Sequence, residues 1–218
     1  MEFTPADTLK KDFEVEGSFY NITLQNKDHQ CRNQARILRK DINAPYTKDA
    51  VFILVNPGSC TPADPSIKIP AMIKDLQTLP FVKAKPDPTQ YQIMRLMNRK
   101  NWNCVYMINL SDICAGKIDL FKEKLMEFQR NDFEAHTIFS KERKEELGRM
   151  VSDTPRIIAG WGANKLIREL ALNVLLHIDR PLFGIKYHTH PFYKHPRPQL
   201  KEKSIAWLEE ISLQLAER

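Results

Sequence analysis

Polar residues follow three short apolar runs of this sequence, at the point where each run ends. They are Asn-Pro-Gly-Ser at 56–59, Asn-Leu-Ser-Asp at 109–112 and Gly-Trp-Gly at 160–162. A fourth segment, 184–198, contains three histidines and three prolines. Amide and imidazole groups donate and accept hydrogen bonds. Asn56, Asn109 and these histidines are therefore the first candidates for a site that orients a water or the polar edge of a ligand.

Each motif also has an ordinary structural explanation. Asn56 could simply form the turn that Asn-Pro-Gly sequences favour, and Asn109 could cap the segment after its strand. The Gly-Trp-Gly turn could be a tight connection with Trp161 in the core, and Trp207 also has the spacing of a core residue. Two strand-end asparagines combined with a His-Pro loop are more specific than any one motif, and we predict a site from the combination.

A metal site is the weaker interpretation of the histidines. His188 and His190 are two positions apart, so both would lie on one face of an extended segment. Asp64 or Asp112 could join them as a ligand, but no third ligand is fixed by spacing, and a hydrogen-bonding role is preferred. The four cysteines are scattered without a Cys-x-x-Cys pair, which favours reduced thiols over a zinc site, an iron–sulfur cluster or disulfides. We predict no metal and no cofactor.

Alternating strand and helix patterns surround these motifs. Strands are predicted at 19–25, 51–55, 104–110 and 156–161, and helices at 87–101, 164–178 and 200–218, with a weaker helical pattern at 66–79 that Pro70 interrupts. This alternation predicts a three-layer α/β/α fold with a central, mainly parallel sheet. In such sheets ligands bind outside the carboxyl ends of the strands, where the polar motifs lie. We expect one domain over residues 1–218, with 1–30 as a peripheral segment.

The composition is that of an ordinary soluble chain, with 42% hydrophobic and 28% charged residues. No apolar run approaches the ~20 residues of a membrane span. The amino terminus also lacks the apolar core of a signal peptide. We expect a cytoplasmic monomer with no membrane segment.

A formal net charge of +6 mildly favours a polyanionic partner. Lys194, Arg197 and Lys201 flank the end of the histidine-rich segment and could contact phosphates, although a solvated rim would carry the same residues. The charged stretch 141–149 is predicted to be a solvated helix face with ion pairs along the helix, and not a binding surface.

Over roughly residues 31–195 the chain resembles the bacterial and phage family called domain of unknown function 1643. The shared pattern is a strand ending in Asn-Pro, an Asp-Pro, a strand ending in Asn-Leu, a Trp-Gly turn and a His-Pro loop. In this sequence the corresponding stretches are "NPGS" (56–59), "DPSI" (64–67), "INLSD" (108–112), "GWG" (160–162) and "HPFY" (190–193). That family names no reaction.

The same strand ends have a more distant similarity to the uracil-DNA glycosylase superfamily. "VNPGS" (55–59) is similar to the Gly-Ile-Asn-Pro-Gly motif of its mismatch-specific uracil and thymine glycosylases. Motifs of its uracil-specific enzymes are similar to "YMIN" (106–109), "AGWG" (159–162) and "HPFYKHPRP" (190–198). The resemblance implies a uracil-DNA glycosylase-like fold and a DNA glycosylase that acts on an extruded base, in repair or in defence against modified foreign DNA.

The resemblance also implies a role for each site residue. Cleavage of an N-glycosidic bond leaves positive charge on the sugar and negative charge on the base. Asn56 would hold the attacking water, Asn109 would contact the base edge at two points, and His190 would donate to the base carbonyl. The pocket wall would be formed by Pro57, Gly58 and Ser59. His195 begins a second His-Pro pair, but we favour His190 because "HPFY" also matches the first family.

Two departures from the superfamily pattern change the expected chemistry. Asn56 stands where the uracil-specific enzymes have an Asp, and an amide cannot act as a base, so a lower intrinsic rate is expected. Gly58 stands where they have a Tyr that blocks a 5-methyl group, so we expect 5-substituted pyrimidines to be accepted. The main alternative is a non-catalytic module that binds a nucleotide or nucleic acid on the same fold. A third hypothesis is an enzyme that acts on a free nucleoside or nucleotide.

Overall fold

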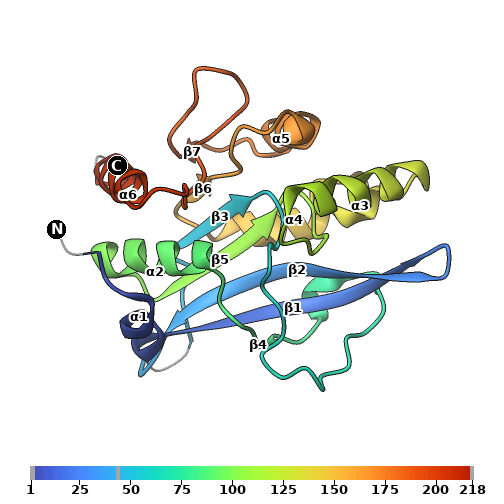
Figure 1. Cartoon of the computed structure of the whole chain (residues 1–218), viewed down its shortest axis with the longest axis horizontal. Helices are drawn as coiled ribbons and strands as arrows, with labels where there is room; N and C mark the ends of the chain where they lie inside the picture. Colours follow the sequence, from blue (N-terminus) through green and yellow to red (C-terminus); the bar gives the residue numbers. More distant parts are fainter. Residues whose placement is uncertain (1–2, 43–44, 217–218) are drawn as a thin grey trace.

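The computed structural model describes residues 3–42 and 45–216. Within them, seven strands form a mixed sheet in the order β4-β1-β2-β5-β3-β6-β7 (Figure 1). The strands are β1 (Phe13–Leu24), β2 (Lys27–Arg39), β3 (Ala50–Leu54), β4 (Val82–Lys83), β5 (Cys104–Asn109), β6 (Ile157–Ala159) and β7 (Leu182–Phe183).

The sheet is parallel in one part and antiparallel in the other. β5, β3, β6 and β7 pair in parallel. β1 pairs antiparallel with β4 on one side and with β2 on the other, and β2 pairs antiparallel with β5. The predicted α/β fold with a sheet that is parallel in its centre is confirmed. Residues 1–30, predicted to be peripheral, supply β1, which lies between β4 and β2 and buries Phe13, Val15 and Phe19.

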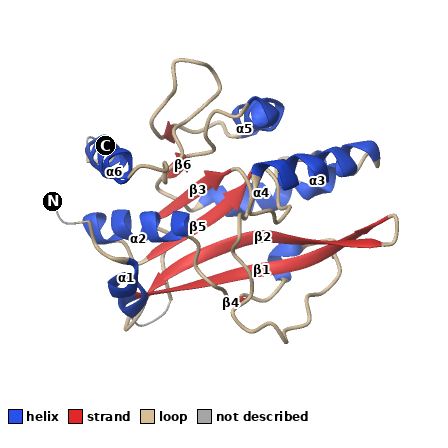
Figure 2. Cartoon of the chain, viewed as in Figure 1, coloured by secondary structure: helices blue, strands red, loops and turns tan. Residues whose placement is uncertain are grey.

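Helices cover both faces of the sheet and complete three layers (Figure 2). The first face is covered by α1 (Ala6–Asp12), α2 (Pro88–Lys100) and α6 (Lys201–Gln214), and the second face by α3 (Ile118–Arg130), α4 (Lys144–Ser152) and α5 (Arg168–His177). Within β3, Phe52 and Leu54 join the apolar cluster of the first face, and Val51 and Ile53 join that of the second. A strand buried on both faces is expected to be continuously apolar, as this one is. None of the described helices has the length and apolar character to cross a membrane.

Three predicted helices are confirmed, and one is wrong. The patterns at 87–101 and 200–218 correspond to α2 and α6, and the pattern at 164–178 to a 3-10 turn, Lys165–Ile167, followed by α5. Trp161 and Trp207 are core residues, as predicted. The segment 66–79 has only a short 3-10 turn at its end. Residues 70–72 instead pair with β1, where the Asn21 amide donates to the Pro70 carbonyl and the Met72 amide donates to the Asn21 carbonyl.

The stretch 141–149 has a solvated face, as predicted, but two of its charged residues are buried. It forms a 3-10 turn, Lys141–Arg143, and the first part of α4. Arg143 and Glu146 are 3% and 4% exposed. An Arg and a Glu three positions apart give the same sequence pattern whether their ion pair is solvated or buried. The burial depends on residues elsewhere in the chain.

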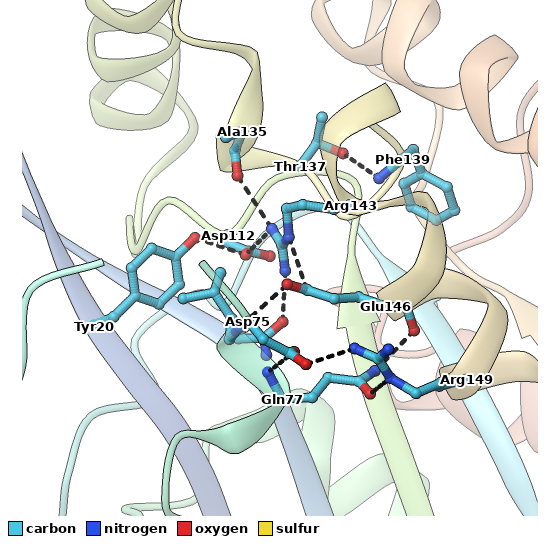
Figure 3. A network of polar contacts seen from close by, with 12 residues as sticks. Tyr20, Asp75, Gln77, Asp112, Ala135, Thr137, Phe139, Arg143, Glu146 and Arg149 are labelled. Atoms are coloured by element: carbon cyan, nitrogen blue, oxygen red, sulfur yellow. Dashed lines mark hydrogen bonds and ion pairs between the residues drawn. The ribbon is translucent and has the colours of Figure 1, made fainter. Parts of the chain in front are cut away.

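Arg143 lies at the centre of a buried polar network (Figure 3). Its guanidinium donates to Asp112 Oδ2 at 2.6 Å, to Glu146 Oε2 at 2.9 Å and to Asn33 Oδ1 at 2.6 Å. Tyr20 donates to the same Asp112 oxygen at 2.8 Å. Burial raises the pKa of Asp112 to about 6, while the Arg143 charge opposes this shift. The carboxylate therefore remains ionised and paired at neutral pH.

Replacing Arg143 with Met should lower the free energy of unfolding by ~3–5 kcal/mol, because Asp112 and Glu146 would be left buried without a cation. Arg149→Met is the matched control. Arg149 pairs with Asp75 at 2.8 Å, but the two side chains are 48% and 42% exposed, so the loss should be ~1 kcal/mol or less. Urea denaturation measures both. Equal losses would show that the buried network does not determine stability.

His136 lies beside this network and is held as a neutral ring. Its Nδ1 is 2.9 Å from Ser111 Oγ, and burial lowers the pKa of His136 from 6.5 to about 4. Between these pH values the unfolded chain binds a proton that the folded protein does not bind. His136 therefore makes the protein less stable as the pH falls from 6.5 toward 4.

Replacing His136 with Asn should remove this titration. Between pH 7.5 and 4.5, the wild type should lose roughly 2–3 kcal/mol more free energy of unfolding than the variant. Urea denaturation at both pH values gives the four free energies that are needed. The same pH dependence in the two proteins would contradict the buried neutral histidine.

Candidate functional site

The order of the parallel strands reverses at β3. β5, which follows β3 among the parallel strands, lies on one side of it, and β6 and β7 lie on the other. Open α/β sheets bind ligands at the carboxyl ends of strands beside such a reversal. A pocket of about 80 Å³ lies at the carboxyl end of β3, and its wall includes Arg32, Asn56, Gly58, Asp87, Gln90 and His195. A larger groove of about 530 Å³ lies between α3 and α5 and contains none of the predicted site residues.

The pocket brings together four of the predicted site residues, namely Asn56, Pro57, Gly58 and His195. Ser59 is exposed and is not part of the wall. His190 lines a different surface pocket together with His188. Both belong to the loop between β7 and α6, which projects from the body of the molecule (Figure 1). The histidine beside Asn56 is therefore His195, and not the favoured His190.

Asn109 is the last residue of β5 and is fully buried. It pairs with Leu54, a residue of the pocket wall, and the alternation of β5 places it on the same face as Met107, another wall residue. Its amide nitrogen and oxygen have no hydrogen-bond partner in the part of the chain that the structure describes. A buried amide without partners is costly. Asn109 thus keeps a donor and an acceptor unused behind the pocket wall.

The amide of Asn56 is held in one orientation by the loop after β5. Its nitrogen donates to the carbonyl of Ala115 at 2.7 Å and to that of Ile113 at 3.3 Å. Carbonyl oxygens only accept, so the amide nitrogen must face them and the amide oxygen must point away. The Asn56 oxygen is therefore an acceptor at the pocket with a fixed direction, which is suited to orienting a water.

His195 is set into the pocket as a neutral donor. His195 Nδ1 lies 3.2 Å from the backbone nitrogen of Arg197 and 3.3 Å from the backbone carbonyl oxygen of the same residue. In the tautomer whose Nδ1 accepts from the Arg197 N–H, the ring proton is on Nε2. Burial lowers the pKa of His195, which keeps the ring neutral. The next residue, Pro196, packs on Gly160, where a Cβ would lie 2.8 Å from the proline ring. The Gly-Trp-Gly turn after β6 thus packs against the His195-Pro196 pair and positions it.

Gly58 has a backbone reason to be glycine. Its φ is +65°, and a Cβ there would lie 3.0 Å from Asp87 Oδ2. A side chain at position 58 would be strained and would point at the carboxylate that caps α2. Asp87 and Gln90 form a capping box at the start of α2, and this box brings both residues to the pocket.

A basic groove of about 440 Å³ lies on the other side of the α2 amino terminus. Arg95, Arg197 and Lys201 line it together with the aromatic rings of Phe3 and Tyr91. Two of the three predicted phosphate-binding residues, Arg197 and Lys201, are in this groove. The third, Lys194, lies 3.5 Å from Glu210, which compensates its charge.

No metal site was found among residues 3–42 and 45–216, where no group of three or more His, Cys, Asp or Glu side chains could hold an ion. Asp112, considered as a ligand for His188 and His190, binds Arg143 instead. The four cysteines are free thiols.

Four polar residues of the pocket wall, Arg32, Asp87, Thr89 and Gln90, were not predicted from the sequence. Asp87 and Gln90 did have a signal, because Asp-x-x-Gln at the start of a predicted helix is a capping pattern and helices of this fold begin near strand ends. Arg32 had none. Its strand, β2, was not predicted, and the direction of its side chain depends on an irregularity of the sheet.

Known proteins give no match. No family model, no characterised protein and no solved structure matches this chain. The resemblances to domain of unknown function 1643 and to the uracil-DNA glycosylases therefore rest on the order of short motifs, and both relationships stay predictions.

Asn56→Asp should lower the free energy of unfolding by ~1–3 kcal/mol at neutral pH, because the new carboxylate would face two carbonyl oxygens in place of an N–H donor. The loss of unfolding free energy should become smaller as the pH falls, because the protonated carboxyl at position 56 of the variant can donate a hydrogen bond to a carbonyl oxygen. Asn164→Asp is the matched control, because the Asn164 side chain uses its oxygen to accept from the Leu166 amide, and Asp caps equally well. Urea denaturation distinguishes the two. Equal effects at positions 56 and 164 would contradict the assigned amide orientation.

Proposed function

We propose that this protein hydrolyses the N-glycosidic bond of a base extruded from DNA, with pyrimidines, including 5-substituted ones, as the substrate class. The observation that carries the proposal is the pairing of two groups in one pocket at the carboxyl end of β3. These are the amide oxygen of Asn56, fixed as an acceptor, and the neutral ring of His195, which donates from Nε2–H in the tautomer whose Nδ1 accepts from Arg197.

The two groups meet the two demands of the reaction. The amide oxygen of Asn56 accepts a hydrogen bond from a water molecule and so directs a lone pair of the water oxygen toward C1′ of the sugar. His195 donates to a carbonyl oxygen of the base as negative charge develops there. His195 thus takes the role that the sequence motif had suggested for His190. Asn56 does not remove the proton from the water, so the rate depends on how well the base leaves and on how well the water is placed.

The dimensions of the pocket support a single-ring substrate. Its volume of about 80 Å³ is well below the 300–1,000 Å³ that is usual for sites of larger ligands. Such a pocket admits the edge of one ring and excludes a whole nucleotide. The rest of a DNA substrate would therefore lie outside, with only the extruded base inserted.

The basic groove supports a nucleic-acid partner. Arg95, Arg197 and Lys201 have no carboxylate partner among the described residues, and they lie beside the helix start that forms part of the pocket. Cations and aromatic rings together are typical of surfaces that bind single-stranded nucleic acid. Phosphates in this groove would leave an adjacent base within reach of the pocket.

A second candidate is a binding module without catalysis. Two features favour it. Asn56 is uncharged and cannot act as a base, and Asp87, the carboxylate of the pocket wall, is engaged in capping α2. Such a module would recognise an extruded base by the same hydrogen bonds and would release nothing.

The test is single-turnover base release from single-stranded DNA that contains uracil, thymine or 5-hydroxymethylcytosine, read as alkali-labile breaks. His195→Ala should reduce release by roughly 100- to 1000-fold, the effect of removing one donor to a developing anion. The matched control is His190→Ala, which removes an exposed histidine of the same loop that does not line the pocket, and it should leave the rate within about threefold. Loss of activity in His190→Ala with none in His195→Ala would overturn the assignment. Salt-dependent DNA binding without any base release would favour the binding module.

A further inference from the structure

Two arginines are buried among the described residues, and they differ in their partners. Arg143 is 3% exposed and pairs with Asp112 and Glu146. Arg32 is 2% exposed, forms no ion pair with any described carboxylate, and its Nε has no hydrogen-bond partner there. Its hydrogen bond from Nη1 to the Pro57 carbonyl is long, at 3.5 Å. A buried charge without a counterion costs several kcal/mol, so the fold holds an uncompensated positive charge at this point.

A β-bulge directs this charge to the pocket. Ala35 of β2 belongs to the apolar cluster of the first face, and strict alternation would place Arg32 on the second face. The register between β1 and β2 shifts between Ser18 and Phe19, which leaves Asn33 without a partner in β1. The extra residue turns Arg32 to the first face, where it forms part of the pocket wall.

Asp87 is the one carboxylate among the residues that line this pocket, and no ion pair joins it to Arg32. Its Oδ1 accepts from the amides of Thr89 and Gln90 at the start of α2. The Gln90 side chain bonds the Asp87 amide and Cys60 Sγ. The amino terminus of α2 adds partial positive charge beside them, which partly offsets the negative charge of Asp87. The Arg32 guanidinium is then the group of the wall that favours a ligand with negative charge on acceptor atoms.

We propose that Arg32 binds negative charge on the oxygen atoms of a pyrimidine ring and thereby stabilises the departing base, an inference that rests on the proposed function. When the bond between C1′ and the ring nitrogen breaks, its electron pair stays on the ring and spreads to the carbonyl oxygens. Water adds to C1′, and the proton that it loses joins the released base. The ring is neutral before cleavage and anionic after it, so the interaction with Arg32 strengthens along the reaction and lowers its barrier.

Free pyrimidines test this site without requiring catalysis. Uracil, thymine and 5-nitrouracil are titrated calorimetrically into the wild type at a pH at which only 5-nitrouracil is an anion, and thymine controls for the 5-substituent. The wild type should bind the anion at least about tenfold more tightly than either neutral ring, since a charge-assisted hydrogen bond is worth roughly twice a neutral one. Equal affinities, or no binding of any of the three rings, would overturn the proposal.

Arg32→Gln should abolish the preference for the anion. Arg36→Gln is the matched control, because Arg36 lies in the same strand but pairs with Glu16 at 2.6 Å, and it should retain the preference. If Arg32→Gln does not fold, Arg32→Lys replaces it and should lose at least threefold of the preference, because an ammonium lacks the planar fork. If the variant at position 32 binds the anion as preferentially as the wild type does, the proposal is overturned. If the wild type prefers the anion, Arg32→Gln abolishes this preference and the wild type releases no base from DNA, then the anion site at Arg32 is supported and the proposed glycosidic reaction is wrong.

Discussion

The ion pair between Asp112 and Arg143 fixes the loop on which both sides of the pocket depend. The Asp112 side chain is held by Arg143 and Tyr20 in the interior. Its backbone carbonyl accepts the Arg32 amide at 2.9 Å, which anchors the bulged part of β2. The residues just after it supply the carbonyls that orient Asn56. One buried carboxylate thus couples the apolar interior of the second face to the polar wall on the first face.

The two buried arginines differ in whether residues of the fold pair with their charge. Arg143 has two carboxylates and an amide oxygen as partners, so its charge is satisfied within the fold. Arg32 is equally buried without such partners, and Asn109 keeps a donor and an acceptor unused. Folded proteins rarely leave buried polar groups unpaired unless a ligand or water meets them. Arg32 and Asn109 lie at or behind the pocket beside the reversal of strand order, which is where the fold class leads one to expect a ligand.

The location of the candidate site and part of its lining could be predicted from the sequence, but the complete set of its residues could not. Asn56 and the Gly-Trp-Gly turn end predicted strands, and parallel strands must bring their carboxyl ends to one edge. The choice between His190 and His195 depended on which His-Pro pair packs on Gly160, where the absence of a side chain lets Pro196 approach. That contact joins residues more than thirty positions apart, and no local pattern encodes it.

The sequence alone determined the local elements whose signals lie within a few residues. The apolar run of β3 requires burial on both faces, the Asp-x-x-Gln box starts α2, and the Asn-Pro-Gly turn ends a strand. Tertiary structure alone decided which charges are buried. The spacing of Arg143 and Glu146 in the sequence is the same whether or not Asp112 packs against them in the fold. Tertiary structure also decided where Arg32 points, since one extra residue in a β ladder reverses the side-chain alternation, and the partner strand, not the sequence of β2, sets the register.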